Sequence, residues 1–415
     1  MPDNPLSAVP AAIARYFRRL GHGQVAAEPA TDDGETRYHP CQGRADRVAA
    51  ELTGRALPPA LLDAFQPAPL GPGSPLFVGR EAYLQRLQKT VDAWRQQRPE
   101  LVAVVGPPGC GVTSLLRQIE TLLEAGERVD YHALDGRPAS AVDALASCAA
   151  LFDIATVPGS VEELAARINA LEPRLIVLDN GHFLACRIMG ASQAVRTFGA
   201  LMVATQERHQ WVLGCNDEAW RRLGYVHRAD RFFEEVIELA PFEREGLGAL
   251  LAARLRSAGV ALALPEGEAA DPAAAEDTDA PAAVGLTDSR IATLQQLSLG
   301  RPAPAFFHLL RALEVPTDAT ALILHPFVRF DYAALDALAR MEMFTLAEIA
   351  VHGGLTAPEH CSLLHLADHD SQMLLQRLCA MGLLERPAGD TLRYRLVPVH
   401  VGAVTQRLHK ANYLY

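Results

Sequence analysis

The sequence predicts an α/β protein with a five-stranded parallel sheet, followed by a helical lid and a C-terminal winged helix. Three observations favour this fold class. Five short apolar runs alternate with helical patterns, a glycine-rich loop directly follows the first run, and the last segment has the pattern of three helices closed by a β-hairpin. Alternation of strands and helices is typical of a doubly wound parallel sheet.

Length and composition limit the class of protein. A chain of 415 residues suggests roughly two to four domains. Hydrophobic residues make up 49% and charged residues 21%, which is a globular composition. No apolar run approaches the ~20 residues of a membrane span. The start lacks a signal-peptide pattern, and the seven cysteines are scattered singly. We therefore expect a soluble protein of a reducing compartment, most simply cytoplasmic.

The charge balance bears on partners. The chain has 38 Lys and Arg against 49 Asp and Glu, a net charge of -11. This disfavours tight, non-specific binding of nucleic acid by the whole molecule, although a local basic face stays open.

Composition shifts divide the chain into four regions. The first holds short helical patterns at 11–20 and 44–52 and ends in a Pro/Gly-rich linker at 67–75. The third contains an acidic insertion that is expected to be disordered. The regions are an N-terminal helical and linker region at 1–75, an α/β domain at 76–242, a helical lid at 243–320 with its insertion at 265–285, and a winged helix at 325–415.

The expected strands are short, all-apolar runs, as in parallel strands that are buried on both faces. They lie at 101–105, 129–134, 175–178, 211–214 and 236–239. Apolar residues at helical spacing predict helices at 80–94, 161–171 and 191–205 between them, and at 241–259, 288–297 and 304–313 in the lid.

The glycine-rich loop is the main candidate for chemistry. It follows the first strand and opens a predicted helix at 113–123, the context of a phosphate-binding loop, where glycines let successive N–H groups point inward. The candidate nucleotide-binding residues are Gly106, Pro107, Pro108, Gly109, Cys110, Gly111, Val112, Thr113 and Ser114. In the pattern G-x-x-x-x-G-K-[ST], Val112 holds the lysine position. A lone G-x-x-x-x-G is weak evidence for a phosphate-binding loop, but the other parts of a nucleotide site follow in the expected order along the chain.

These further parts lie at the ends of later elements. Asp179 ends the third run, where a carboxylate would meet Mg²⁺ held also by Thr113 or Ser114. Asn216 follows the fourth run and is placed to orient a γ-phosphate or a water. Arg301 begins a helix in the next, all-helical segment, and the sequence FVGRE at 77–81 precedes the first helix.

On these motifs the chain resembles the AAA+ family, nearest the branch of origin-recognition, transposition-regulator and STAND-type ATPases. The resemblance covers about residues 76–313, and the winged helix matches the same branch. It implies a sheet in the order 5-1-4-3-2, a helical lid, ATP and Mg²⁺ as ligands, and work in assemblies with protein partners or other copies. The matching positions are Gly106, Gly109, Gly111, Thr113, Asp179 and Asn216.

Three departures from the family pattern weaken the predicted chemistry. Val112 replaces the lysine, Asn180 replaces the second acid that polarises water, and Ala303 stands where the lid arginine often lies. Arg301 or Arg311 is a candidate to compensate, since either could swing toward the site. Arg228 and Arg231 occupy the region of the family's neighbour-sensing arginine finger, and the alternative for both is a solvated surface position.

Magnitudes separate binding from turnover. Losing one charge-assisted bond to a phosphate costs ~1.5–3 kcal/mol, or roughly ten- to a hundredfold in affinity. Losing one donor that stabilises the transition state lowers the reaction rate by a factor of ~10²–10³, and losing a water-orienting base lowers it by ~10²–10⁴. The sequence therefore favours a protein that can bind nucleotide weakly but hydrolyses it near the background rate.

Three functions stay open. The first is a nucleotide-responsive regulatory or scaffold protein. The second is an active ATPase whose cation comes from Arg117, Arg301 or the Arg231 of another copy. The third is a DNA-binding adaptor that uses the winged helix. DNA binding ranks below protein docking, because the candidate recognition helix at 370–381 offers one basic side chain, Arg377, and the wing adds Arg386, Arg393 and Arg395.

Overall fold

The structure is a computed structural model. It describes residues 38–40, 57–185, 187, 191–265, 286–316, 321–386 and 393–414. The helical patterns predicted at 11–20 and 44–52, nearly all of the acidic insertion at 265–285 and the turn predicted at 388–390 lie outside these ranges. Within them, no helix has the length and apolar character needed to cross a membrane.

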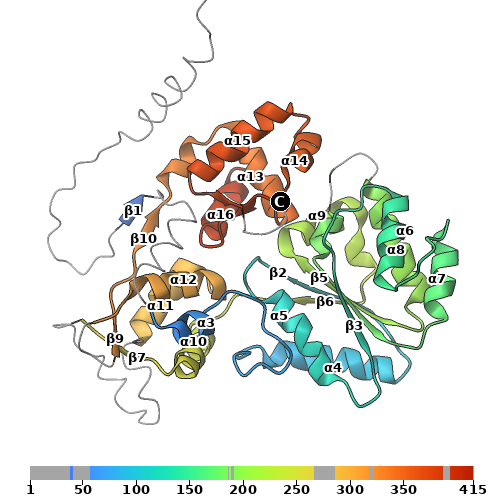
Figure 1. Ribbon diagram of the computed structural model, residues 1–415, viewed down its shortest axis with the longest axis horizontal. Helices are drawn as coiled ribbons and strands as arrows, with labels where there is room; N and C mark the ends of the chain where they lie inside the picture. The colour runs from blue at the N-terminus through green and yellow to red at the C-terminus, as the bar shows by residue number, and fades with distance from the viewer. Residues whose placement is uncertain are drawn as a thin grey trace, which may run out of the picture. The chain divides into compact units, whose positions relative to one another are not determined.

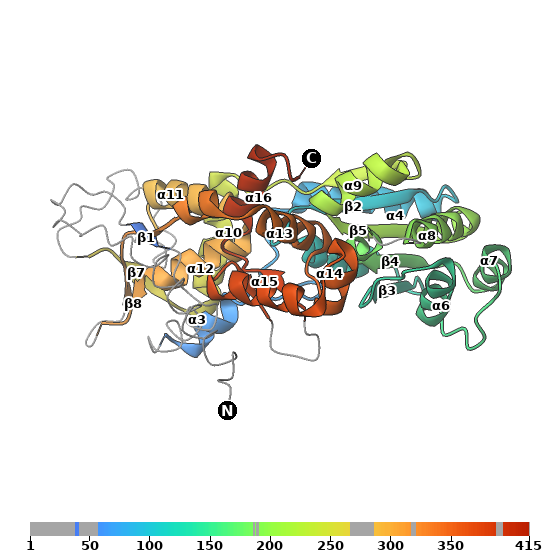
Figure 2. The same ribbon diagram turned by 90° about the horizontal axis from the view of Figure 1, so that it is seen from above.

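The central sheet has five parallel strands in the order β3-β4-β5-β2-β6, of which Figure 2 shows β3, β4, β5 and β2 side by side. Counted along the chain, this is the predicted order 5-1-4-3-2, and the five-stranded parallel sheet is confirmed. The strands are β2 (Leu101–Gly106), β3 (Val129–Ala133), β4 (Leu175–Asp179), β5 (Gln210–Asn216) and β6 (Glu235–Glu238).

Each face of the sheet is covered by helices, which is why the strands are apolar throughout. Val102 and Val104 pack in one core with α4 (Glu81–Arg95) and α5 (Val112–Arg117). Leu101, Ala103 and Val105 point the other way and share a core with a second helical layer (Figure 1). That layer consists of α6 (Ala141–Leu151), α7 (Val161–Asn169), α8 (Ala191–Thr205) and α9 (Asp217–His227).

Two details of this domain differ from the sequence expectation. The helix expected at 113–123 is α-helical only to Arg117 and continues as the 3-10 helix η2 (Gln118–Leu122). The segment 67–75, interpreted as a linker, lies against this helix. The N–H of Leu70 donates to Ser114 Oγ at 3.1 Å, and the N–H of Gly73 donates to Gln118 Oε1 at 2.9 Å. We call residues 66–78 the strap.

The lid contains helices and a small sheet. The helices are α10 (Arg244–Ala258), α11 (Asp288–Ser298) and α12 (Pro302–Ala312). An all-helical segment was expected, and this is wrong in one part: β7 (Ala261–Ala263), β9 (Ala321–Leu324) and β8 (Leu313–Glu314) form a three-stranded sheet in that order. Strands this short carry no readable periodicity, because alternation needs about four to eight residues.

Helix α3 (Pro59–Ala64) joins the lid core. It packs against α10, and the ring of Phe65, just beyond it, meets Phe306 of α12 edge-on at 5.3 Å. This part of the predicted N-terminal region therefore contributes buried side chains to the lid.

The C-terminal module, residues 340–414, has the predicted sequence of three helices, a hairpin and a last helix. Its elements are α13 (Arg340–His352), α14 (Ala357–Leu364), α15 (Asp368–Ala380), the antiparallel pair β11 (Leu384–Glu385) and β12 (Arg395–Leu396), and α16 (Val401–Lys410). A β-bridge joins Leu355 to Tyr394. Before the module, β10 (Arg329–Asp331) pairs in parallel with β1 (Tyr38–Pro40), and the 3-10 helix η7 (Ala333–Ala337) follows. The winged-helix interpretation stays a prediction.

The module packs against the α/β domain, with α13 beside α9 (Figures 1 and 2). Arg137, which follows β3, donates to Glu359 Oε1 and to the carbonyl of His352, both at 2.7 Å. Glu348 of α13 is buried and binds Arg222 and Arg187, each at 2.8 Å. Burial alone would raise the pKa of Glu348, but these arginines outweigh it and lower the pKa. The module is therefore fixed next to the carboxyl end of the sheet.

Candidate nucleotide site

A cavity of about 730 Å³ lies at the carboxyl ends of the strands, the usual place for ligands in parallel sheets. The α/β domain, the strap, the lid and the C-terminal module all contribute to its wall. All nine predicted loop residues line it: Gly106, Pro107, Pro108, Gly109, Cys110, Gly111, Val112, Thr113 and Ser114.

The loop conformation depends on its glycines. Gly109 and Gly111 have φ values of 84° and 103°, which side-chain-bearing residues rarely adopt. At Gly106 a Cβ would come within 2.6 Å of Cys110 Sγ. The loop is closed by a turn in which the N–H of Cys110 donates to the carbonyl of Pro107 at 3.1 Å. Burial raises the pKa of Cys110 to about 12, so this side chain is a thiol and not a reactive thiolate.

Val112 places an apolar group beside Asp179. A Cβ built on Gly214 of β5 would lie 3.5 Å from Val112 Cγ1 and 2.8 Å from Asp179 Oδ1. Both side chains therefore lie next to Gly214 of β5, as does that of Leu116. A lysine at position 112 would bring an ammonium group into this region, whereas the isopropyl group cannot neutralise an anion.

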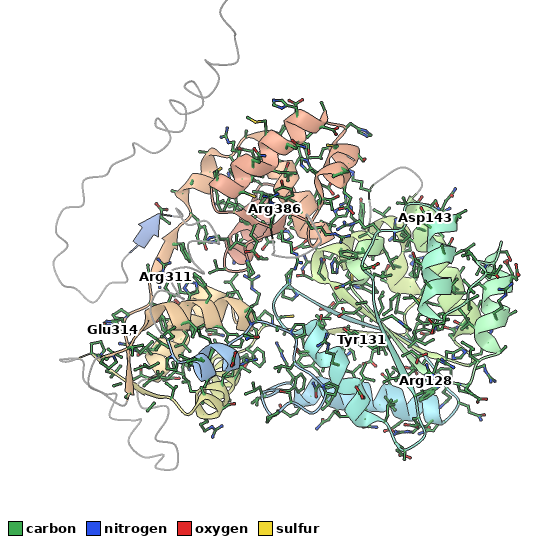
Figure 3. All side chains as sticks on the ribbon, viewed as in Figure 1. Arg128, Tyr131, Asp143, Arg311, Glu314 and Arg386 are labelled. Atoms are coloured by element: carbon green, nitrogen blue, oxygen red, sulfur yellow. The ribbon has the colours of Figure 1, made fainter. Side chains whose placement is uncertain are left out.

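The carboxylate of Asp179 is already engaged by the protein. Tyr131 of β3 (Figure 3) donates its hydroxyl to Oδ2 at 2.6 Å, and the N–H of Asn180 donates to Oδ1 at 2.7 Å. Burial, together with the bond to Asp179, raises the pKa of Tyr131. The phenol therefore stays protonated and keeps donating.

These contacts bear on whether the predicted ligands fit Mg²⁺, which proteins bind through carboxylate oxygens. Both oxygens of Asp179 accept a short hydrogen bond, and the Ser114 hydroxyl accepts one from the strap. Thr113 lines the cavity without supplying charge. In the described ranges no group of three or more His, Cys, Asp or Glu side chains could hold a metal. Each oxygen of Asp179 thus keeps one further acceptor position, and the role of Thr113 and Asp179 in Mg²⁺ binding stays a prediction.

The two predicted asparagines line the cavity, but their amides serve the protein. Asn180 has a left-handed φ of 60°, and its Nδ2 donates to the carbonyl of Leu134 at 3.0 Å. Asn216 Oδ1 accepts from the N–H of Ala219 at 2.7 Å and so caps α9, while its Nδ2 donates to the carbonyl of Val351 at 3.1 Å.

Two predicted arginines lie apart from the described cavity wall. Arg301 precedes α12, is 4% exposed, and donates through Nε to the carbonyl of Ser298 at 3.3 Å. Its guanidinium lies against Gly402 of α16. Arg231 is exposed and ends the 3-10 helix η4 (Ala229–Arg231), and Arg228 is exposed as well. The structure brings together the loop, Asp179, Asn180 and Asn216. Arg301 lies outside the cavity wall but within electrostatic reach of Cys110 in the loop, and Arg231 is exposed elsewhere.

Four other arginines line the cavity: Arg80, Arg254, Arg393 and Arg395. Arg80 donates to the carbonyl of Cys110 at 3.3 Å and stacks over the ring of Phe242 at 3.7 Å. The sequence pointed to Arg80 only as part of the FVGRE motif at 77–81, and that motif does not predict this contact. Arg393 and Arg395 come from the predicted wing, which the sequence left open between DNA binding and protein docking, with DNA binding ranked lower. Only the chain fold shows that they reach this cavity.

No protein-family model matches the sequence, and the search of curated proteins finds no match. Among solved structures, the chain is similar to the Aeropyrum pernix ORC2 protein in its ADPNP–ADP complexes, with 14% identity, a TM-score of 0.39 and coverage of 84% of this chain and 98% of that one. Cdc6p from Pyrobaculum aerophilum has 16% identity and a TM-score of 0.37, with coverage of 84% of this chain and 98% of that one. The Thermotoga maritima RuvB Holliday junction branch migration motor has 14% identity and a TM-score of 0.30, with coverage of 79% of this chain and 95% of that one.

Because these scores are low, we assign the fold from the strand order and the position of the loop. A P-loop follows the first strand of a parallel sheet in the order 5-1-4-3-2. The chain thus has the AAA+ type of P-loop fold.

Proposed function

We propose that this protein is a nucleotide-responsive regulatory or scaffold protein that binds adenine nucleotide in the loop-lined cavity and hydrolyses it poorly. The observation that carries the proposal is Val112 beside Asp179, within a loop whose glycines and cavity are intact. The binding surface is retained, and the ammonium group that neutralises a triphosphate is replaced by an apolar side chain.

The surroundings of Asp179 support weak turnover. Hydrolysis needs a group that orients or deprotonates water, and such a group raises the reaction rate by a factor of ~10²–10⁴. Asn180 stands at that position, and its amide is bound to the carbonyl of Leu134. A neutral amide engaged elsewhere is a poor general base. Binding can survive these changes, because backbone groups and the cavity wall remain.

The contacts of the C-terminal module support a regulatory role. It lines the cavity and binds the α/β domain through Arg137 and Glu348, so a ligand in the cavity would touch both parts. We infer that protein partners or further copies read this arrangement, in a soluble, cytoplasmic setting. DNA binding by the module has less support, because Arg393 and Arg395 line the cavity and leave Arg386 (Figure 3) as the wing arginine outside its wall.

Calorimetry with ATP and steady-state phosphate release test this function. We expect weak but saturable ATP binding, together with release at the rate of a protein-free control. Release at an ordinary ATPase rate that Asp179→Ala abolishes would show that the protein is an enzyme. The second candidate, an ATPase with a substitute cation, would then stand, and the wing arginines on the cavity wall favour it.

A further inference from the structure

We propose that the cavity binds a nucleoside polyphosphate as a metal-free anion, and that Arg395 and Arg393 of the wing supply the positive charge that a lysine and Mg²⁺ provide in other phosphate-binding loops. The inference rests on the proposed function, namely that the cavity takes a nucleotide. It adds the form of the ligand and the residues that neutralise it.

The first step concerns the metal. Tyr131 and the N–H of Asn180 occupy the two oxygens of Asp179 at 2.6 and 2.7 Å. A divalent cation at this carboxylate would have only the second lone pair of each oxygen to bind. Without that cation and without a lysine at position 112, the phosphates need positive charge from another element.

The second step concerns how the wing is held. The backbones of Leu355 and Tyr394 exchange two hydrogen bonds, of 2.9 and 2.7 Å. Arg393 donates to the carbonyl of Asp135 at 2.8 Å and lies over the ring of Phe183 at 4.5 Å. The base of the wing is thus tied both to its own module and to the end of the sheet, next to the cavity.

The third step concerns the charge that is available. Arg395 lines the cavity and is exposed to solvent. Its aliphatic stem is packed near Gly354, where a Cβ would lie 2.9 Å from Cγ. Glu385 is its cross-strand neighbour. Within the described ranges, no hydrogen bond or ion pair engages the Arg395 guanidinium. Such a group can bind a phosphate with two parallel hydrogen bonds.

The charges around His182 bear on the source of positive charge at this end of the cavity. His182 lines the wall near Arg137, Arg393 and Arg395. Burial, followed by the charges of Arg137, His352 and these wing arginines, lowers its pKa to about 3. The imidazole is neutral at physiological pH, so the positive charge near it belongs to the arginines, and Asp135 and Glu385 on the same cavity wall oppose that charge.

ATP binding in EDTA and in excess Mg²⁺, measured by calorimetry on the full chain, tests the inference. We expect affinity in EDTA to equal or exceed that in Mg²⁺. Arg395→Gln should weaken binding about ten- to a hundredfold, the loss of one charge-assisted contact, and Arg393→Gln should weaken it in the same direction. Arg386→Gln, on the same wing but outside the cavity wall, should bind as the parent does.

The outcomes distinguish a failure of the proposed function from a failure of this inference alone. No ATP binding by the parent in either buffer would overturn the proposed function and this inference with it. Binding that requires Mg²⁺ would overturn the inference alone, as would unchanged affinity in both Arg395→Gln and Arg393→Gln. Circular dichroism of each variant confirms that a lost affinity is not a lost fold.

Discussion

Val112 shows how one side chain changes the chemistry of an otherwise regular loop. The backbone around it has the glycine conformations that a phosphate loop needs, and Leu115 and Leu116 anchor the helix behind it in the core. The substitution is thus compatible with the fold and affects the ligand only. This is why binding and turnover can be separated experimentally at this position.

Restoring the lysine tests that separation. Val112→Lys adds an ammonium group beside Asp179, and we expect ATP affinity to rise roughly ten- to a hundredfold. Phosphate release should stay near background, because Asn180 still stands where an acid would polarise water. Val112→Met is the matched control, since it lengthens the side chain without charge. An equal gain with methionine would show that charge is not the missing element.

The sequence pointed to some of the residues that share the cavity wall, but neither to all of them nor to how they are used. Glycine spacing and strand ends were enough to gather the loop, Asp179, Asn180 and Asn216. The partners that occupy these groups come from distant parts of the chain, such as Tyr131 for Asp179 and Val351 for Asn216. Local patterns carry no information on such contacts. For the same reason the wing arginines could not be assigned to the cavity.

Among the elements, α3 and the residue that follows it tie the N-terminal region to the lid. Phe65 is 1% exposed and packs edge-on against Phe306. Arg254 of α10 lies over the same Phe306 ring and donates to the carbonyl of Ala64. This short helix escaped sequence analysis because six residues next to a Pro/Gly-rich stretch resemble a linker. The five apolar strands and several longer helices, such as α8 and α10, were predicted, whereas α6 and α9 were not.

Truncating this anchor should destabilise the lid. We expect Phe65→Ala to lower the free energy of unfolding by about 3–5 kcal/mol, the usual effect of removing a buried phenyl ring. Urea denaturation followed by circular dichroism measures the change. Phe232→Ala is the matched control, because that ring is 49% exposed and should matter by less than about 0.5 kcal/mol. Equal losses in both variants would mean that α3 is not a structural part of the lid.

At the scale of the whole molecule, five histidines in the described ranges share one electrostatic property. Burial is the main cause that lowers the pKa of each, to about 3 for His182 and His308 and to about 4 for His352, His360 and His400. In the unfolded chain each would titrate near about 6.5. Between these values, the unfolded chain takes up protons that the folded protein excludes.

Stability should therefore be complete above about pH 6.5 and fall as the pH is lowered toward 4. Each such histidine contributes up to about 1.4 kcal/mol per pH unit. Thermal unfolding midpoints between pH 7.5 and 5 measure the slope. His360 binds Thr345 and Ser371 through its two ring nitrogens, and His360→Gln should make the slope shallower. The exposed His369→Gln should leave it unchanged, and a flat profile in the parent would contradict the assignment.

The strap sets a limit on how far the chain can be trimmed. A shortened version that begins at Leu76 would look complete by sequence, since the α/β pattern starts there. It would lack the partners that Ser114 and Gln118 hold at Leu70, Gly71 and Gly73, together with part of the cavity wall. Exposed polar groups and an open flank would then sit next to the phosphate loop, so a failure of that fragment to bind nucleotide would say nothing about the intact protein.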